Sequence, residues 1–250
     1  MSKKEAAKKK RLEEIEAELF KHLEDEERER AENLLQNLYP DEGPLRRELY
    51  RPHLAFFKAG KIHRERLVLA GNRTGKSLGI GGYETTHHLT GRYPDWWEGR
   101  KFNHPIDCMV AGDTGTTVRD INQTILLGPP TAIGTGLIPR KDIIKTRPKA
   151  GGIPDAIESA YIRNIYGGTS ILTFKSYAEG RVSFQGTAKH VIWLDEEPPL
   201  NIYGECILRT MTTDGIVMAT FTPLSGMSEV VMQFLPNGKL PDHGSYIVNE

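Results

Sequence analysis

A short apolar run leads directly into a glycine turn that ends in Lys76 and Ser77. This spacing is that of a phosphate-binding P-loop, with an alanine where the first glycine usually stands. In such a turn Gly75 lets backbone N–H groups close around phosphates, Lys76 reaches the β and γ oxygens, and the Ser77 hydroxyl binds Mg²⁺. The predicted binding residues are therefore Ala70, Gly71, Asn72, Arg73, Thr74, Gly75, Lys76 and Ser77.

An acidic pair, Asp195 and Glu196, follows a second apolar run, and Asp195 lies 119 positions beyond Lys76. In a P-loop protein Asp195 holds Mg²⁺, either directly or through a water molecule. Glu196 is placed to orient or deprotonate the water that attacks the γ-phosphate, which is the work of a general base. This adjacency separates ATPases with a catalytic glutamate at a strand end from kinases and small GTPases. The alternative is that both acids merely end a strand before two prolines.

A third apolar run, residues 216–220, ends in the hydroxyls of Thr220 and Thr222. Ligands bind at the carboxyl ends of parallel strands, so either hydroxyl is placed to distinguish ATP from ADP. The alternative is that threonines stand there for their β-propensity alone. Trp193 lies inside the run that precedes Asp195, and we expect it to pack in the core rather than to stack on a base.

These runs are the candidate strands of an α/β fold. Five of them are apolar on both faces, which is typical of a mostly parallel sheet flanked by helices. They cover residues 67–69, 108–110, 170–174, 191–194 and 216–220. The interval between about 128 and 168 is rich in Gly and Pro, and it fits either an irregular insertion or a β-hairpin.

The first forty residues form a candidate helical arm. No Pro or Gly occurs between Lys8 and Leu38, and apolar residues recur there with helical spacing. The turn residues at 39–44 then separate an arm (1–40) from the main domain (41–250). A basic start and a later acidic run fit a docking arm for DNA or a neighbouring subunit, or else a solvated helix of interleaved charges.

Composition limits the remaining possibilities. Lys plus Arg equals Asp plus Glu at 33 each, so contact with DNA requires local basic patches or assembled subunits. Cys108 and Cys206 lack the spacing of a metal site or a disulfide framework, and we expect both in the core. No run of about 18 apolar residues is present, so no membrane association is expected.

Three stretches taken together carry a family resemblance. AGNRTGKS, VIWLDEEPPLNIYGECILRT and MATFTPLSGMSEVV resemble the large terminase subunit of tailed double-stranded DNA phages, notably the headful-packaging podovirus type. The similarity extends from about Arg66 to Val231. It implies a P-loop ATPase fold in which Lys76 and Ser77 are Walker A residues, Asp195 is the Walker B acid, and Glu196 is the catalytic carboxylate. Thr220 to Thr222 would then be the motif that couples hydrolysis to movement.

The resemblance also implies roles that the chain fits less closely. His53 stands in an adenine-contacting segment where a Gln is often found, and a plain surface histidine is the alternative. Arg73 either points at the γ-phosphate, in a catalytic role, or only shapes the loop. A ring ATPase takes an arginine finger from a neighbouring subunit, and the candidates are Arg119, Arg140, Arg147, Arg163 and Arg181.

The function implied is a motor that uses ATP and Mg²⁺ to move double-stranded DNA through a portal protein into a procapsid, in the host cytoplasm during virion assembly. Its implied partners are the small terminase subunit and further copies of itself in a ring, a pentamer by the same resemblance. The carboxyl-terminal nuclease domain of the family is not expected in this chain. Two alternatives stay open: a helicase or other DNA-dependent P-loop ATPase, and a nucleotide-bound assembly module without catalysis.

Overall fold

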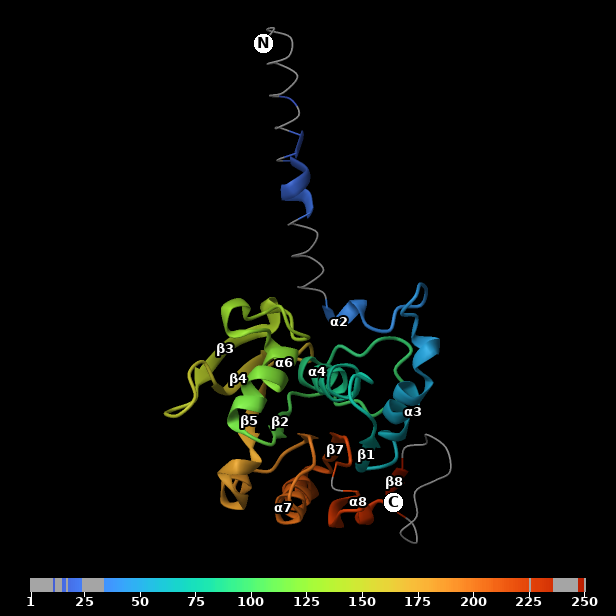
Figure 1. The fold of residues 1–250 in the computed structure, drawn as a ribbon, viewed down its shortest axis with the longest axis vertical. Coiled ribbons are helices and arrows are strands. Elements are labelled where there is room, and N and C mark those ends of the chain that lie inside the picture. The colour runs from blue at the N-terminus through green and yellow to red at the C-terminus, as the bar shows by residue number, and fades with distance from the viewer. Residues whose placement is uncertain are drawn as a thin grey trace.

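An eight-stranded sheet forms the centre of the computed structural model, which describes residues 11, 15–16, 18–23, 34–224, 226–235 and 247–249 (Figure 1). The strand order is β3-β4-β5-β2-β6-β7-β1-β8. Neighbouring strands from β5 to β1 pair in parallel, and β8 pairs with β1 in antiparallel fashion. The parallel strands are β5 (Thr169–Ser176), β2 (Asp107–Gly112), β6 (Val191–Asp195), β7 (Ile216–Phe221) and β1 (Glu65–Leu69), and β8 spans Ile247–Asn249.

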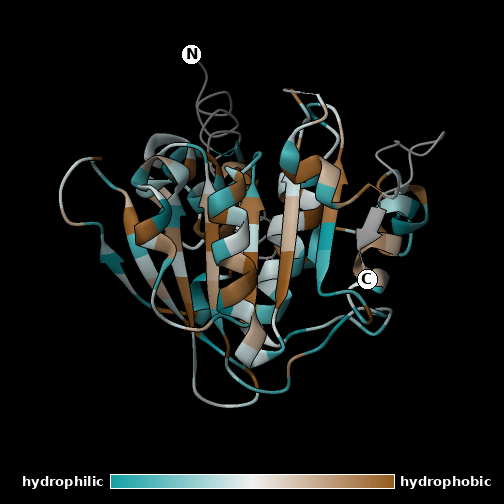
Figure 2. Ribbon diagram, turned by 90° about the horizontal axis from the view of Figure 1, so that it is seen from below, coloured by the Kyte–Doolittle hydropathy of each residue, from teal (hydrophilic) through white to brown (hydrophobic). Residues whose placement is uncertain are grey.

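The five parallel strands are those that the apolar runs predict, so the α/β fold with a mostly parallel sheet is confirmed. The undecided interval contains a hairpin of β3 (Ile143–Pro148) and β4 (Ile157–Arg163), paired in antiparallel fashion. Every residue of β6 and β7 is buried, as a strand covered on both faces requires. Figure 2 shows the hydrophobic colouring of the central strands.

Helices cover the sheet on both faces (Figure 1). One apolar cluster lies under α3 (Arg51–Ala59), the helix from Lys76 to Thr90, and the helix from Gly115 to Leu127. The other lies under α7 (Leu200–Thr210) and α8 (Glu229–Gln233). Trp193 belongs to the first cluster and Cys206 to the second, and Cys108 is also buried, which confirms the predicted core positions of all three.

Two of these helices are locally π-helical. In the first, η2 (Lys76–Gly82) continues into α4 (Tyr83–Thr90); in the second, α5 (Gly115–Thr117) is followed by η3 (Val118–Gln123) and α6 (Thr124–Leu127). π-Helical turns are rare and occur frequently at functional sites. The remaining helical segments are α2 (Leu34–Asn37), η1 (Arg47–Tyr50), η4 (Pro130–Ala132), η5 (Arg140–Asp142), η6 (Tyr177–Glu179), η7 (Arg181–Phe184) and η8 (Met211–Thr213).

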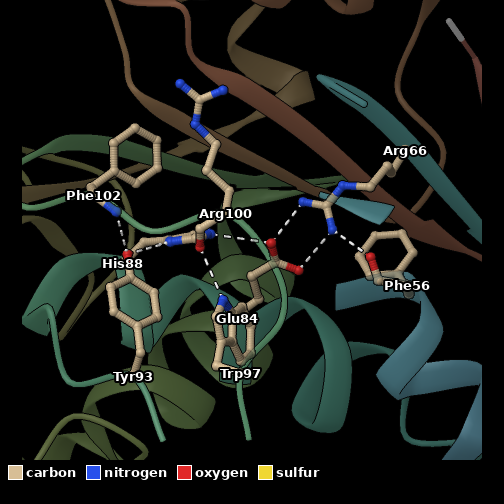
Figure 3. A network of polar contacts seen from close by, with 8 residues as sticks. All are labelled: Phe56, Arg66, Glu84, His88, Tyr93, Trp97, Arg100 and Phe102. Atoms are coloured by element: carbon tan, nitrogen blue, oxygen red, sulfur yellow. Dashed lines mark hydrogen bonds and ion pairs between the residues drawn. The ribbon is translucent and has the colours of Figure 1, made fainter. Parts of the chain in front are cut away.

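A fully buried ion pair joins β1 to the helix that follows the glycine turn (Figure 3). The Arg66 guanidinium donates to both oxygens of Glu84, at 2.7 and 3.0 Å, and to the Phe56 carbonyl of α3 at 2.8 Å. His88 lies 3.1 Å from the same carboxylate and contacts the Tyr93 hydroxyl at 2.9 Å. The network therefore fixes α3, β1 and α4 relative to one another.

The predicted arm falls mostly outside the described residues. Residues 15–16 and 18–23 are helical, and Ile15, Leu19 and Leu23 are exposed. Leu34 and Leu38 pack against the first apolar cluster, where the chain enters the main domain. The basic residues 3–10 and the acidic run 24–29 lie outside the described residues, so the boundary near residue 40 stays a prediction.

Candidate nucleotide-binding site

The glycine turn begins where β1 ends and leads directly into η2. Gly75 adopts a left-handed backbone with φ +83°, a conformation that glycine adopts without steric cost. Arg73 also has positive φ, at +63°. Residues 71–75 are exposed, whereas Lys76 is only 7% exposed. The turn therefore presents its backbone to solvent at the start of a helix, as a phosphate-binding loop does.

Asp195 is held by side chains from three elements. Its Oδ1 accepts hydrogen bonds from the Ser77 hydroxyl at 2.9 Å and from the Thr220 hydroxyl at 2.8 Å. Its Oδ2 accepts from the Asn122 amide at 3.0 Å. The glycine turn, the carboxyl ends of β6 and β7, and η3 thus meet at one carboxylate.

The electrostatics of the acidic pair follow from this arrangement. Burial raises the pKa of Asp195, while its three hydrogen bonds and the charge of Lys76 act in the opposite direction. Burial also raises the pKa of Glu196, the charge of Asp195 raises it further, and Lys76 lowers it. Lys76 is therefore close enough to both carboxylates to influence them electrostatically.

Glu196 occupies a strained backbone conformation. Its φ is +66°, which is uncommon for a residue with a side chain. Its N–H donates to the Thr220 carbonyl at 3.1 Å, and its own carbonyl accepts from the Tyr177 hydroxyl at 3.0 Å. These contacts fix the Glu196 backbone where the strand ends.

β7 lies between β1 and β6 in the sheet, and its end touches both motifs. The Thr222 hydroxyl donates to the Ala70 carbonyl at 2.9 Å and lies 3.2 Å from the Asn72 side chain. Thr220 contacts Asp195, as described above. The two predicted hydroxyls therefore connect the acidic pair to the loop.

His53 borders a cavity of about 380 Å³ beside the loop, whose lining includes Tyr50, Val68, Thr74, Lys76 and Ile80. The Tyr39 hydroxyl lies 2.5 Å from His53 Nδ1 and donates to the Gly79 carbonyl at 2.7 Å. Burial lowers the pKa of His53, so the ring is neutral near pH 7. The position is half-buried against the loop, in contrast to a plain surface histidine.

The oxygen donors fit a magnesium ion. Mg²⁺ prefers carboxylate and hydroxyl oxygens, and Ser77 Oγ and Asp195 supply one of each at 2.9 Å from one another. Asn122 and Thr220 orient the carboxylate, as outer partners of metal ligands commonly do.

The comparison with known families decides the assignment. Residues 67–242, more than half of the chain, match the family described as terminase large subunit, T4-like-virus type, N-terminal. The chain belongs to the terminase large subunit family. It is 36% identical over 252 aligned residues to the large terminase subunit of Salmonella phage P22, which confirms the resemblance to phage large terminases.

That alignment covers 93% of this terminase chain and 48% of the relative, so the chain spans about half the length of the curated relative that it matches. Two solved structures are also similar. One is the large terminase of a thermophilic bacteriophage, with a TM-score of 0.47 at 11% identity over 65% of this chain and 34% of that chain. The other is the same phage protein in complex with ADP, with a TM-score of 0.41 at 11% identity over 64% and 34%.

Several contacts of this terminase site have no signal in the sequence. Asn122 and Tyr177 belong to no motif, and their roles follow only from the way η3 and η6 fold against β6. Trp193 packs in the core as expected, but its indole N–H also donates to the Thr220 hydroxyl at 2.7 Å. In the sequence, the one feature that could have indicated this contact is the N–H group of the indole ring.

The arginines predicted from the family differ in their surroundings. Arg73 is exposed and has no polar partner among the residues that the structure describes. Arg119 pairs with Asp120, and Arg181 pairs with Glu205. Arg140, Arg147 and Arg163 are exposed and have no ion pair within the described part of the chain. No helix among the described residues combines the length and apolarity needed to cross a membrane.

Proposed function

We propose that this chain is the ATPase part of a viral DNA-packaging motor. The observation that carries the proposal is the meeting of the loop and the acidic pair. Ser77 lies 2.9 Å from Asp195, and the charge of Lys76 acts on both Asp195 and Glu196. Family membership supports the same function.

The residues divide the reaction among them. The turn from Ala70 to Gly75 cradles the phosphates, Lys76 binds the β and γ oxygens, and His53 lies beside the base. Ser77 and Asp195 would hold Mg²⁺, which would neutralise charge on the phosphates. Glu196 accepts a proton from the attacking water. At the same time the water oxygen bonds to the γ-phosphorus, and the bond between that phosphorus and the β,γ-bridging oxygen breaks. Burial and the neighbouring Asp195 charge raise the pKa of Glu196, which favours acceptance of a proton.

Thr220 and Thr222 connect this step to the rest of the molecule. Thr220 contacts the carboxylate that holds the metal, and Thr222 contacts the loop that holds the phosphates. A change in phosphate state at either place is therefore passed to the end of β7. We propose this strand end as the coupling motif of the motor.

The partners are part of the proposal. They are double-stranded DNA, the portal protein, the small terminase subunit, and further copies of this chain in a ring, a pentamer by family resemblance. The work takes place in the host cytoplasm during virion assembly. One of the exposed arginines is proposed to act in the neighbouring subunit's site.

Glu196→Gln tests the proposed catalysis. We expect the affinity for ATP to stay unchanged, because the phosphate contacts remain, and turnover to fall by about 10²-fold or more, because the general base is lost. Phosphate release in the presence of double-stranded DNA and procapsids measures turnover, and equilibrium binding of labelled ATP measures affinity. Glu197→Gln makes the same chemical change one residue away and serves as the matched control.

Lys76→Ala is a third variant. We expect it to lose nucleotide binding, because the side chain that binds the β and γ oxygens is removed. Turnover by Glu196→Gln equal to that of the unmodified chain would remove Glu196 from catalysis. If the unmodified chain binds ATP and releases no phosphate even with DNA and procapsids, the chain is a nucleotide-bound assembly module instead.

A further inference from the structure

At one end of the sheet, three strands have a face that the apolar cluster under α7 and α8 does not reach in the part of the chain that the structure describes. On β5 the residues alternate: Leu172 and Phe174 are buried in the first apolar cluster, whereas Ile171, Thr173 and Lys175 are half-buried on the opposite face. The second apolar cluster, under α7 and α8, includes no residue of β3, β4 or β5. Figure 1 shows α7 and α8 below the central strands and β3, β4 and β5 beyond them at one end of the sheet.

Cations line this face of β3, β4 and β5. Lys145 lies opposite Tyr161 in the register, with its Nζ 4.4 Å from the centre of the tyrosine ring. Arg147 lies opposite Ser159, which in turn lies opposite Thr173. Arg163 ends β4, and Lys175 stands near the end of β5. We call this surface the open basic face; its residues are Lys145, Arg147, Ser159, Tyr161, Arg163, Ile171, Thr173 and Lys175.

The charge of this region contrasts with that of the whole chain. The chain has 33 basic and 33 acidic residues, whereas positions 140–181 contain eight Lys and Arg against four Asp and Glu. Two of those acids are already paired, Asp142 with Arg92, and Glu179 with Lys149 and Lys175. Arg147 and Arg163 have no ion pair within the described residues and are exposed. Lys145, Arg147 and Arg163 therefore present exposed positive charge without an ion-pair partner within the described part of the chain.

Protection of a sheet edge explains only part of this pattern. Lysines on an exposed edge strand prevent pairing with other chains, and β3 is such an edge. Arg163, however, lies on β4, which is paired on both sides. An exposed cation on an interior strand requires another reason.

We infer that the open basic face binds the phosphate backbone of double-stranded DNA, an inference that rests on the proposed function. Lys145 and Arg147 are two residues apart on one strand and so project about 6.6 Å apart on the same face. The seven residues of β4 give the face a length of about 20 Å. A flat, elongated row of cations fits a linear row of phosphates, and contacts of this kind are independent of base sequence.

The open basic face is also joined to the nucleotide site through η3. Asn122 of η3 contacts Asp195, while its neighbour Gln123 donates to the Asp155 carbonyl at 3.0 Å and accepts from the Ile157 N–H at 2.9 Å. Arg119 donates to the Pro154 carbonyl at 3.1 Å. These contacts hold the segment that starts β4, so one short helix touches both the metal-binding carboxylate and the hairpin that presents the cations.

Charge reversal on β3 tests the inference. We expect Lys145→Glu with Arg147→Glu to lower the affinity for a 30-base-pair duplex by about tenfold or more at low salt. The slope of log affinity against log salt should become shallower by about two, because two phosphate contacts are lost. Fluorescence anisotropy over a range of KCl concentrations measures both. Lys61→Glu with Lys101→Glu makes the same number of charge reversals on exposed lysines elsewhere and should bind DNA as the unmodified chain does.

Arg163→Glu separates DNA binding from edge protection, because Arg163 is not on an edge strand; we expect its salt slope to become shallower by about one. The inference is overturned if the β3 double variant binds the duplex as tightly as the unmodified chain, or if only its tendency to aggregate changes. Binding of poly-glutamate but not of the duplex would assign the face to an acidic protein and would also overturn it. ATP hydrolysis without DNA by the unmodified chain and by the Lys61→Glu, Lys101→Glu control tells a failure of this inference apart from a failure of the proposed ATPase.

Discussion

Asp195 is the residue on which the site converges. Its carboxylate accepts hydrogen bonds from Ser77, Thr220 and Asn122, each from a different element. In the proposed reaction Ser77 turns its hydroxyl to the metal, so Thr220 and Asn122 remain to orient the carboxylate. Asn122 is fully buried, and its side-chain oxygen has no hydrogen-bond partner among the described residues. Such a position is costly to maintain without a function.

Asn122→Ala tests this positioning role. Loss of a partner that orients a metal ligand typically weakens metal affinity by about 10- to 100-fold. We therefore expect the Mg²⁺ concentration that gives half-maximal turnover to rise by about that factor. Binding of ATP without Mg²⁺ should be unchanged, which a merely structural defect would not predict. Asn201→Ala, at an exposed position of α7, is the matched control, and an unchanged Mg²⁺ dependence would contradict the role.

The residues with fixed spacing were predictable from the sequence, and those brought in by packing were not. Lys76 and Ser77 stand within one turn, and Asp195 and Glu196 end one apolar run, so local pattern identifies them. Asn122 lies 73 positions before its partner Asp195 and has no neighbouring motif. Its role depends on how η3 packs against β6, which no local pattern records.

At the scale of elements, the helix after the loop is tied to its strand by a buried charge pair. Arg66 and Glu84 are both fully buried, and Arg66 also donates to the backbone of α3. Gly81 of the same helix lies so close to Trp193 that an added Cβ would overlap the indole ring. These contacts fix the direction in which the loop faces the end of β6.

Glu84→Gln should destabilise the fold by about 3–5 kcal/mol near pH 7, because it leaves the buried Arg66 charge without its counter-charge. Burial tends to raise the pKa of Glu84, but Arg66 and His88 more than offset this, so the pKa lies below its usual value. The stability from ionised Glu84 is therefore present above the usual glutamate pKa and is lost as the pH falls through the lower folded value.

The difference between the unmodified chain and Glu84→Gln should accordingly shrink on acidification. Urea denaturation at several pH values measures it. Glu98→Gln, which breaks the exposed pair with Lys58, should have a much smaller effect on stability, because solvent screens exposed charges. A loss for Glu84→Gln as small as that of this control would contradict the role of the buried pair.

The elements themselves were largely predictable, with instructive exceptions. Apolar runs identified all five parallel strands, and β6 and β7 are mostly apolar and buried throughout because both of their faces are covered, whereas β5 alternates between buried and half-buried residues. β3 and β4 were left open between an insertion and a hairpin, because one face of each is polar and their register contains irregularities. The π-helical segments were not predictable, since their spacing depends on packing at the site.

At the scale of the whole molecule, basic and acidic residues balance in number, and positive charge gathers in one region. The net charge is zero, yet the nucleotide site lies at the ends of the central strands and the open basic face lies at one end of the sheet. A DNA-packaging motor needs both a nucleotide site and a DNA-binding surface. Hydrolysis at the nucleotide site must change how tightly the other surface binds DNA. η3 is the element that contacts both regions.

The most direct measurement is packaging of double-stranded DNA into empty procapsids by the complete terminase, compared with its Lys76→Ala form. Protection of the DNA from added nuclease measures the packaged length. The unmodified protein should protect DNA only when ATP is supplied, and Lys76→Ala should protect none. The account would be contradicted if Lys76→Ala protected as much DNA as the unmodified protein does. If the protein separates DNA strands without procapsids, the chain is a helicase instead.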